Sequence, residues 1–564
     1  MGLRDAARTA WGGVRGVFRK ETIGKDAVAG VVLGVEAIPD GLASGLLAGL
    51  NPLAGVYAYL FGLLGATWFT SSTLMAVQAT SAMSLVIADT GIGAGPDPAG
   101  ALVVLGLLTG LVMIIAGVLG GGRLLRFVPT AVMTGFVTAV GVNIVLGQLA
   151  NFTGAEGEGG NRLTRSVDLI LHVGRFDWPT VLVGAVTAGL VVWLTRSRLR
   201  SLGLVVAVVT GSALTAALDA WAGTSIAVVQ DVAPVAPGLP GPVLPDLSRW
   251  FDLLLPALSL SFVALIQGAA VSDALPNPDG RRSDASRDFV GQGAGSVLAG
   301  LFQGMPVGGT MSGSSIVAAA GARTKLALFI AAGTMATLLL VASGLVAYVA
   351  MPALAALLIV VGISSIKPAR IRSVLGTGPF QTAVMAVTFV LTLVIPLQFA
   401  VLVGVGLGIL LFVAEQSNGL RVRQLDLGGD GRLRERAPDP ELPARTVVVL
   451  QPYGSLFFAS APVFERALPA FTPTTTRSVV IVRLRGVEQI GLSLVGVLRR
   501  YAHELADRDS RLVLVVSEEK VLAQLDAGGL LAELGPEGLV RSGEWVTEGV
   551  RRAYAEASEW VERG

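Results

Sequence analysis

Apolar stretches long enough to cross a lipid bilayer recur along the first 416 residues of the chain. A membrane-spanning helix needs roughly 20 apolar residues, and this rule places seven segments in each half of that region. The expected segments are 28–48, 53–70, 73–89, 100–119, 127–148, 179–195 and 202–222, followed by 253–272, 289–303, 310–320, 326–348, 350–362, 378–395 and 398–416. Only 15% of all residues are charged, against about 25% in soluble domains. The sequence therefore predicts a polytopic α-helical membrane protein with 14 transmembrane segments.

Two of these stretches are interrupted near the middle by small and hydroxyl-bearing residues. They are Thr73–Ala88 and Gly304–Ala320, and each is the third segment of its half. Short, broken spans at matching positions of two halves are typical of transporters built from an inverted repeat. We therefore expect a seven-plus-seven inverted repeat, with repeats at residues 26–222 and 252–416 of a transmembrane domain spanning 26–416.

Each interruption is expected to create one wall of a polar pocket. A break leaves backbone N–H groups unpaired at the start of a half-helix, which the membrane interior tolerates only where they line a cavity. The positive end of the half-helix dipole then faces that cavity. The substrate-binding candidates are Gln78, Ala79, Thr80 and Ser81 in the first break, and Ser312, Gly313, Ser314 and Ser315 in the second. The alternative interpretation is that these small residues serve as packing surface between helices.

Three longer polar residues lie within other apolar segments. Glu36 and Asp40 are four residues apart in the first segment, so they share a helix face. A carboxylate facing hydrocarbon costs about 3 kcal/mol or more, and we therefore expect both to face protein or water, where they would bind Na⁺ or exchange H⁺. Gln267, in the middle of the eighth segment, is a further candidate for the substrate or coupling-ion site. For all three, a hydrogen-bonded contact between helices is the structural alternative.

Basic residues set the expected orientation of the membrane domain. Six Lys and Arg residues lie in the segment 1–25, whereas the loops 90–100 and 223–247 contain none. Short cytoplasmic loops carry an excess of Lys and Arg, so the N-terminal segment is predicted to be cytoplasmic. An even number of crossings then returns the chain to the cytoplasm. We expect a multi-pass protein of the inner or plasma membrane with both termini in the cytoplasm.

The composition changes after the last apolar segment. A polar linker is expected at 417–445, followed by a soluble α/β domain at 446–564. Buried strands are predicted at 446–451, 478–484 and 511–516, and amphipathic helices near 461–470, 491–505, 518–526 and 544–560. About 115 residues are enough for one compact core.

Several kinds of chemistry are excluded or disfavoured. The chain has no cysteine, which rules out disulfides and thiolate metal sites. His172 and His503 stand alone, and each is interpreted as a surface or packing residue. The glycine-rich runs 117–122 and 291–296 lack the strand and lysine of a phosphate-binding loop, so they predict close helix packing. We expect no cofactor other than Na⁺ or H⁺ as a coupling ion, no nucleotide or nucleic acid, and no enzymatic activity.

Four parts of the chain together resemble one transporter family. They are residues 37–57 (AIPDGLASGLLAGLNPLAGVY), residues 132–149, residues 290–315 (VGQGAGSVLAGLFQGMPVGGTMSGSS) and the C-terminal α/β domain. In this order they resemble the SulP family of anion transporters, the bacterial relatives of the animal sulfate and chloride/bicarbonate exchangers, with a C-terminal STAS domain. The resemblance implies a uracil-permease-like fold with core and gate domains and an elevator movement of the core. It also implies an anion held between the third and tenth segments, and a homodimer.

The chain departs from the family pattern at several positions of the expected site. Gln267 stands where many members carry a carboxylate, and Gly313 follows Ser312 where many carry an arginine. Asp40 replaces a common glutamine, and Gln78–Ala79 replaces a Gly-Pro pair. In the STAS-like domain, the Asp-Ser pair that is phosphorylated in anti-sigma-factor antagonists is absent, and Ser493 is displaced from it. The sequence therefore disfavours a phosphorylation switch, and we expect dimer contact or folding support instead.

The resulting hypothesis is a secondary active transporter of a small inorganic or carboxylate anion, such as bicarbonate or sulfate. Its substrate would lie between the two breaks, flanked by Asp40 and Gln267, with Na⁺ or H⁺ carried by Asp40. Two alternatives remain open at this stage. One is an uncoupled anion channel or exchanger, and the other is a transporter of a neutral or weakly acidic solute such as a nucleobase.

Overall fold

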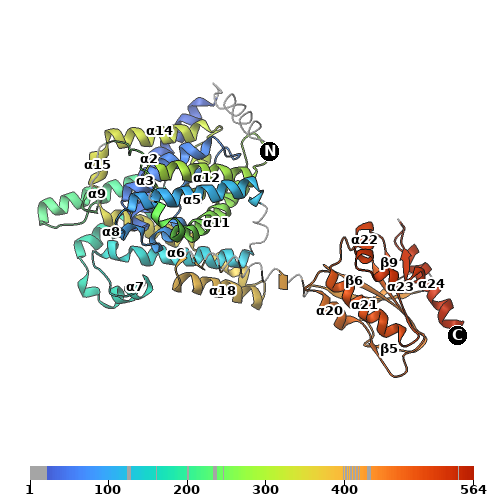
Figure 1. Cartoon of the computed structure of the whole chain (residues 1–564). Coiled ribbons are helices and arrows are strands. Elements are labelled where there is room, and N and C mark those ends of the chain that lie inside the picture. The colour runs from blue at the N-terminus through green and yellow to red at the C-terminus, as the bar shows by residue number, and fades with distance from the viewer. Residues whose placement is uncertain are drawn as a thin grey trace. The chain divides into compact units, whose positions relative to one another are not determined.

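The protein folds into two compact units, residues 1–408 and 409–564. The computed structural model describes residues 22–122, 129–160, 162–197, 199, 202–232, 238–245, 247–397, 419–428, 433–543 and 545–563, with scattered residues between 399 and 417. The first unit is helical and the second contains a mixed sheet with helices (Figure 1). Each unit is described separately below.

The helices of the first unit follow the expected apolar segments closely. In the first repeat they are α2 (Ile23–Leu47), α3 (Pro52–Thr67), α4 (Ser81–Asp89), α5 (Pro98–Val118), α6 (Thr130–Thr153), α8 (Trp178–Thr195) and α9 (Leu202–Ala222). In the second they are α11 (Trp250–Ala274), α12 (Ala285–Leu301), α13 (Met311–Ala319), α14 (Leu326–Val341), α16 (Met351–Ser365) and α18 (Pro379–Val394). Shorter helices are α7 (Arg162–Leu171), α10 (Val229–Val232), α15 (Ser343–Ala347) and α17 (Pro368–Leu375).

The polytopic helical fold is thereby confirmed, while the number of crossings stays a prediction. Within the described part of the chain, seven helices are long and apolar enough to cross a membrane, and α3, α14 and α18 are shorter apolar helices. The expected last segment, 398–416, and the N-terminal segment 1–25 lie mostly outside the described residues.

Capping residues in the sequence explain where two of these helices begin. Asn51 accepts a hydrogen bond from Leu53 N at 2.9 Å and is followed by Pro52, the first residue of α3. Asp97 caps α5 in the same way, because its Oδ1 accepts a hydrogen bond from Gly100 N at 2.9 Å. An Asx side chain satisfies a free N–H of the first turn, and proline at the first helical position loses no hydrogen bond there.

The helices of the first unit pack as two bundles. The first bundle contains α2–α5 and α11–α14, which pack mainly on one another, and the second contains α6–α9 and α16–α18. Figure 1 shows α5, α11 and α12 lying side by side, and α2 beside α14. Glycines permit the close approach of α5 and α12, because a Cβ on Gly110 would lie 2.5 Å from the carbonyl oxygen of Gly293. The expected packing role of the glycine-rich run 291–296 is therefore observed.

The second unit is built on a six-stranded sheet with the order β10-β9-β8-β6-β3-β4. Its strands are β3 (Arg421–Leu427), β4 (Leu433–Arg436), β6 (Val447–Tyr453), β8 (Val479–Leu484), β9 (Arg511–Val516) and β10 (Leu539–Arg541). β6, β8, β9 and β10 run parallel, whereas β3 is antiparallel to both β6 and β4. The short strands β5 (Glu441–Leu442) and β7 (Ala470–Phe471) form a separate pair.

Helices cover both faces of this sheet. On one face lie α20 (Ala461–Ala467), α21 (Leu492–Ala506), α22 (Glu519–Ala527) and α23 (Leu530–Leu534), which share one apolar core. On the other face α24 (Glu548–Glu562) packs Val550 and Ala557 against Val479 and Ile481 of β8. The predicted strands and helices of this domain are all present.

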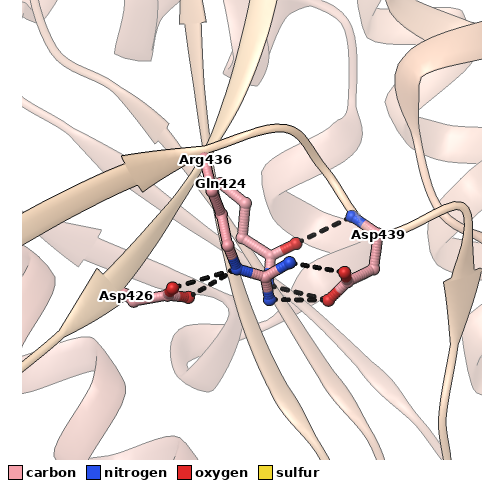
Figure 2. A network of polar contacts seen from close by, with 4 residues as sticks. All are labelled: Gln424, Asp426, Arg436 and Asp439. Carbon is pink, nitrogen blue, oxygen red and sulfur yellow. Dashed lines mark hydrogen bonds and ion pairs between the residues drawn. The ribbon is translucent and has the colours of Figure 1, made fainter.

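One expectation for this region needs correction. Residues 417–445 were expected to be a polar linker, but they contain β3 and β4, which pair in the sheet. Arg436 on β4 donates to Asp426 on β3 at 2.9 Å and also contacts Asp439, while Gln424 accepts from Asp439 N at 3.0 Å (Figure 2). The hydrogen bonds from Arg436 to the Asp439 carboxylate hold the pKa of Asp439 below its usual range. The charged side chains lie on a partly exposed edge hairpin, where burial is low, so composition alone resembled that of a linker.

Candidate functional site

The two interrupted segments meet in the interior of the first bundle. β1 (Ala76–Gln78) pairs with β2 (Gly308–Thr310) in antiparallel register, with Ala76 opposite Thr310 and Gln78 opposite Gly308. Because each strand leads directly into a half-helix, α4 leaves one end of the strand pair and α13 leaves the other. The amino ends of both half-helices are therefore adjacent to the same short sheet, as the inverted repeat requires.

Side chains tie the two segments together across this sheet. Thr310 Oγ1 donates to Gln78 Oε1 at 3.0 Å, and Ser314 Oγ accepts from Ala76 N at 2.9 Å. Thr80 caps α4, because its Oγ1 accepts a hydrogen bond from Met83 N at 3.3 Å. By contrast, Thr310 at the corresponding position before α13 makes no side-chain cap. The first turn of α13 thus keeps donors that a ligand can use.

Two amide groups, one in the strand pair and one on α11, carry polar atoms without a partner in the described structure. Gln78 is 1% exposed, and its Nε2 has no hydrogen-bond acceptor. Gln267 Oε1, on α11, is also buried and unpaired. An unsatisfied buried polar group costs about 1–3 kcal/mol, so native proteins retain few of them away from ligands, ions or water. Of the two, Gln78 Nε2 lies in the strand pair itself and is the stronger sign of a ligand position there.

Glycines explain how α11 and α13 approach the strand pair so closely. A Cβ on Gly309 would lie 2.8 Å from the Cα of Gly268, the neighbour of Gln267 on α11. A Cβ on Gly313 would lie 2.4 Å from Gln78 Oε1. The absence of a side chain at position 313 therefore makes room for the Gln78 amide.

The expected substrate residues differ in how accessible they are. Ala79, Thr80, Gly313 and Ser314 are buried, and Ser81 and Ser315 are half-buried. Ser312 is exposed, as is the adjacent Met311, which is 41% exposed. The site is thus buried along the strand pair and accessible at the start of α13.

The carboxylates of α2 lie in the protein interior, as expected. Glu36 is 3% exposed, and Asp40 is half-buried. Asp40 Oδ2 accepts a hydrogen bond from Tyr59 on α3 at 2.8 Å, and the Tyr59 hydroxyl lies 3.1 Å from Ser44 Oγ. α2 also contacts α4 and α13. This places the helix that carries both carboxylates against the half-helices.

A row of polar residues on α12 supports the site, and sequence reasoning missed it. Asp288, Gln292 and Ser296 recur every four residues, and each is at most 1% exposed. Gln292 Oε1 accepts from Gly309 N at 2.9 Å, and Ser296 Oγ bonds both the N–H and the carbonyl of Val307 at 3.1 Å. These contacts fix the chain on both sides of Gly308. The spacing of four residues places the three side chains on one helix face and could have predicted this row. The surrounding glycines instead favoured an interpretation as a helix-packing surface.

Asp288 fixes the approach to β1 in the same way. Its Oδ1 accepts from Ser72 N at 2.8 Å and from Ser71 Oγ at 2.8 Å, and its Oδ2 accepts from Ser272 Oγ at 2.8 Å. The carboxylate thus joins α12 and α11 to the loop between α3 and β1. Together the three residues of α12 hold both interrupted segments in place.

No group of three or more His, Asp or Glu residues suited to a metal ion occurs in the part of the chain that the structure describes. His172 contacts Asp168 at 2.9 Å and His503 contacts Glu533 at 3.2 Å, and the side chains of both are about half exposed or more. Each histidine therefore lies at the surface of its unit beside one carboxylate.

Comparisons with known proteins agree with this architecture. The model of the sulfate permease family matches residues 23–388, and that of the STAS domain matches residues 440–542. YbaR of Bacillus subtilis, which is named for sulfate transport, is 27% identical over 451 residues, covering 78% of this chain and 83% of YbaR. The bicarbonate transporter BicA of Picosynechococcus is 25% identical over 403 residues, 70% of each chain.

A solved structure shares the fold of nearly the whole chain. Murine Slc26a9, described as an anion transporter in the inward-facing state, matches with a TM-score of 0.84 at 18% identity. The match covers 97% of this chain and 94% of the murine chain. With a family match that spans most of the membrane unit and a STAS match in the second unit, the chain belongs to the sulfate permease family of membrane transporters.

Proposed function

We propose that this protein is a secondary active transporter of a small inorganic or carboxylate anion, with bicarbonate and sulfate as the first candidates. The observation that carries the proposal is the unpaired Gln78 Nε2, which is buried beside the paired starts of α4 and α13. A buried N–H donor at the positive ends of two half-helices suits an oxyanion.

The anion would be held without an arginine. The expected ligands are the Gln78 amide, the backbone N–H groups at the start of α13, and the hydroxyl of Ser312. Partial positive charges at helix starts act strongly where water is excluded, so a fixed cation is not required. Gln267 would complete the site from α11, because Gly268 next to it touches Gly309.

Coupling to Na⁺ or H⁺ is assigned to Asp40. A negatively charged substrate and a cation neutralise each other, which lowers the cost of carrying either through the membrane interior. Asp40 lies on α2, which contacts both half-helices. Its Oδ2 accepts a hydrogen bond from Tyr59, and no described residue donates to its Oδ1. Glu36, one turn away and buried, would share the cation or proton.

Movement is proposed to follow the division into two bundles. The first bundle carries every candidate ligand, so it would act as the core, and the second would act as the gate. An elevator displacement of the core against the gate would expose the site to each side in turn. We further propose a homodimer in the inner or plasma membrane.

The contacts between loops support a common side for several of the loops, as the proposed crossings require. Asp26, in the first turn of α2, accepts hydrogen bonds from Thr324 N at 3.0 Å and from Thr324 Oγ1 at 2.8 Å, and Thr324 follows α13. Asp288, at the start of α12, meets Ser71 and Ser72, after α3. All of these residues fall on the cytoplasmic side if the N-terminus does, which is where the basic loops place it.

Uptake into proteoliposomes tests the proposal directly. Purified protein should accumulate labelled bicarbonate or sulfate when a Na⁺ or pH gradient is imposed, and excess uracil should not compete. Asp40→Asn should abolish gradient-driven uptake and leave the thermal unfolding midpoint unchanged, while Asp252→Asn, at the exposed start of α11, should behave as the parent. Full gradient-driven uptake by Asp40→Asn would remove Asp40 from the mechanism.

An uncoupled channel or exchanger is the second candidate. The hydrogen bond from Tyr59 to Asp40 favours it, because this contact gives the carboxylate a structural role between α2 and α3. Anion flux that ignores both gradients would select this candidate.

A further inference from the structure

Asp89 at the carboxyl end of half-helix α4 reaches across to the other bundle. Its Oδ1 forms an ion pair with Arg162 Nη2 at 2.7 Å, and its Oδ2 accepts a hydrogen bond from Leu397 N at 2.6 Å. We refer to Asp89, Arg162 and the N–H of Leu397 as the Asp89 clasp. Both carboxylate oxygens are therefore occupied by groups from outside the bundle to which α4 belongs.

The clasp crosses the boundary between the two bundles. α4 belongs to the first bundle and carries candidate ligands at its opposite end. Arg162 is the first residue of α7, which packs on α6, and Leu397 follows α18, which also packs on α6. The partners are separated from Asp89 by 73 and 308 residues, so they are brought together by the tertiary fold alone.

The charge of Asp89 is poorly placed for the stability of α4 itself. A carboxylate in the last turn of a helix faces the negative end of the helix dipole, which costs about 0.3–1 kcal/mol. The side chains of Arg162 and Asp89 are 27% and 16% exposed, so their attraction is only partly screened by water. The clasp offsets this cost through contacts made only while the two bundles are together at this end.

We propose that Asp89 and Arg162 are positioning residues that hold the α4 bundle against the second bundle, so that the clasp must open in each transport cycle. The inference rests on the proposed movement of one bundle against the other. While the clasp is closed, the site is shielded from the side on which α4 ends. Ser312, at the other half-helix start, is exposed, so its accessibility from each side can report on the clasp.

The lack of native cysteine allows a clean accessibility test of the full chain. Ser312→Cys supplies one thiol at the site, and a membrane-impermeant maleimide is applied to intact cells and, separately, to inside-out vesicles. On the side where α4 ends, the labelling rate should rise about threefold to tenfold in Asp89→Asn and in Arg162→Gln, as expected for loss of a partly buried ion pair. On the opposite side of the membrane, the labelling rate of these variants should fall or stay constant.

Matched variants separate the clasp from a general loosening of the fold. Arg165→Gln removes an exposed arginine on the same helix, whose Nε donates to Gly159 O, and should label as the Ser312→Cys parent does. Arg162→Lys should retain most of the protection. The double variant Asp89→Asn/Arg162→Gln should label no faster than the faster single variant, because both remove one interaction.

The outcomes are distinguishable from failure of the proposed transport function. Equal labelling of the Arg162→Gln and Arg165→Gln variants would overturn the clasp, as would additive rates in the double variant. If the clasp variants change labelling as predicted but the protein that retains Ser312 takes up no anion under any gradient, the proposed function fails and the positioning role stands.

Discussion

Replacing Gly313 with alanine should weaken anion uptake by displacing the Gln78 amide. The added Cβ would lie 2.4 Å from Gln78 Oε1, whereas non-bonded heavy atoms prefer a separation of about 3.5 Å. The amide must therefore move by about 1 Å. Gln78 is 1% exposed, so it has no free direction into solvent. Its hydrogen bond from Thr310, 3.0 Å long, is the contact that will be lost.

The size of the effect follows from two interactions. Losing the neutral hydrogen bond from Thr310 costs about 1 kcal/mol, and losing the Nε2 donor to a charged anion costs about 1.5–3 kcal/mol. The first term lowers stability, and the second weakens binding. Since about 1.4 kcal/mol corresponds to a factor of ten, the KM for the anion should rise about tenfold to a hundredfold, with a smaller change in maximal rate.

The assay is initial uptake into proteoliposomes as a function of anion concentration. Gly333→Ala is the matched control, because Gly333 lies in helix α14 and a Cβ there would meet nothing within 4 Å. In the double variant Gln78→Ala/Gly313→Ala the clash is absent, so its KM should equal that of Gln78→Ala. An unchanged KM in Gly313→Ala would refute the assignment of Gln78 as an anion ligand.

Two further predictions concern stability. Asp288→Ala should lower the free energy of unfolding of the detergent-purified protein by about 3 kcal/mol or more, because Ser72 and Ser272 lose a buried charged acceptor. Asp279→Ala, at an exposed position, should leave the free energy of unfolding unchanged. Equal unfolding midpoints for Asp288→Ala and the parent would contradict the role of Asp288. Arg436→Leu should destabilise the C-terminal unit at pH 7. Arg436 lowers the folded-state pKa of Asp439. The stability that this ion pair contributes is therefore fully present above the unfolded-state pKa of Asp439, about 3.9, and is lost as pH falls through the folded-state pKa. The urea midpoints of variant and parent should therefore converge in acid, and a constant difference would disprove the link.

The helices and strands were predictable because their signals are local. The length of an apolar segment reports the cost of transferring it into lipid, so the bounds of α2, α6 and α9 fall within a few residues of expectation. The broken segments were found from composition in the same way, and β6, β8 and β9 from continuous buried runs. β3 and β4 were missed because an edge hairpin with charged, partly exposed side chains carries no such signal.

The arrangement of the site required the tertiary structure. The residue types of Thr73–Ala88 and Gly304–Ala320 predicted that both segments are interrupted. They did not predict that Ala76 pairs with Thr310, that Gln292 accepts a hydrogen bond from Gly309, or that Asp89 forms an ion pair with Arg162. The sequence by itself determined which segments cross the membrane and where two of them break, because hydrophobicity and backbone propensity act within a few neighbouring residues. Only the tertiary structure decided which donor meets which acceptor, because those partners lie as many as 308 residues apart and become neighbours only when the two repeats pack together.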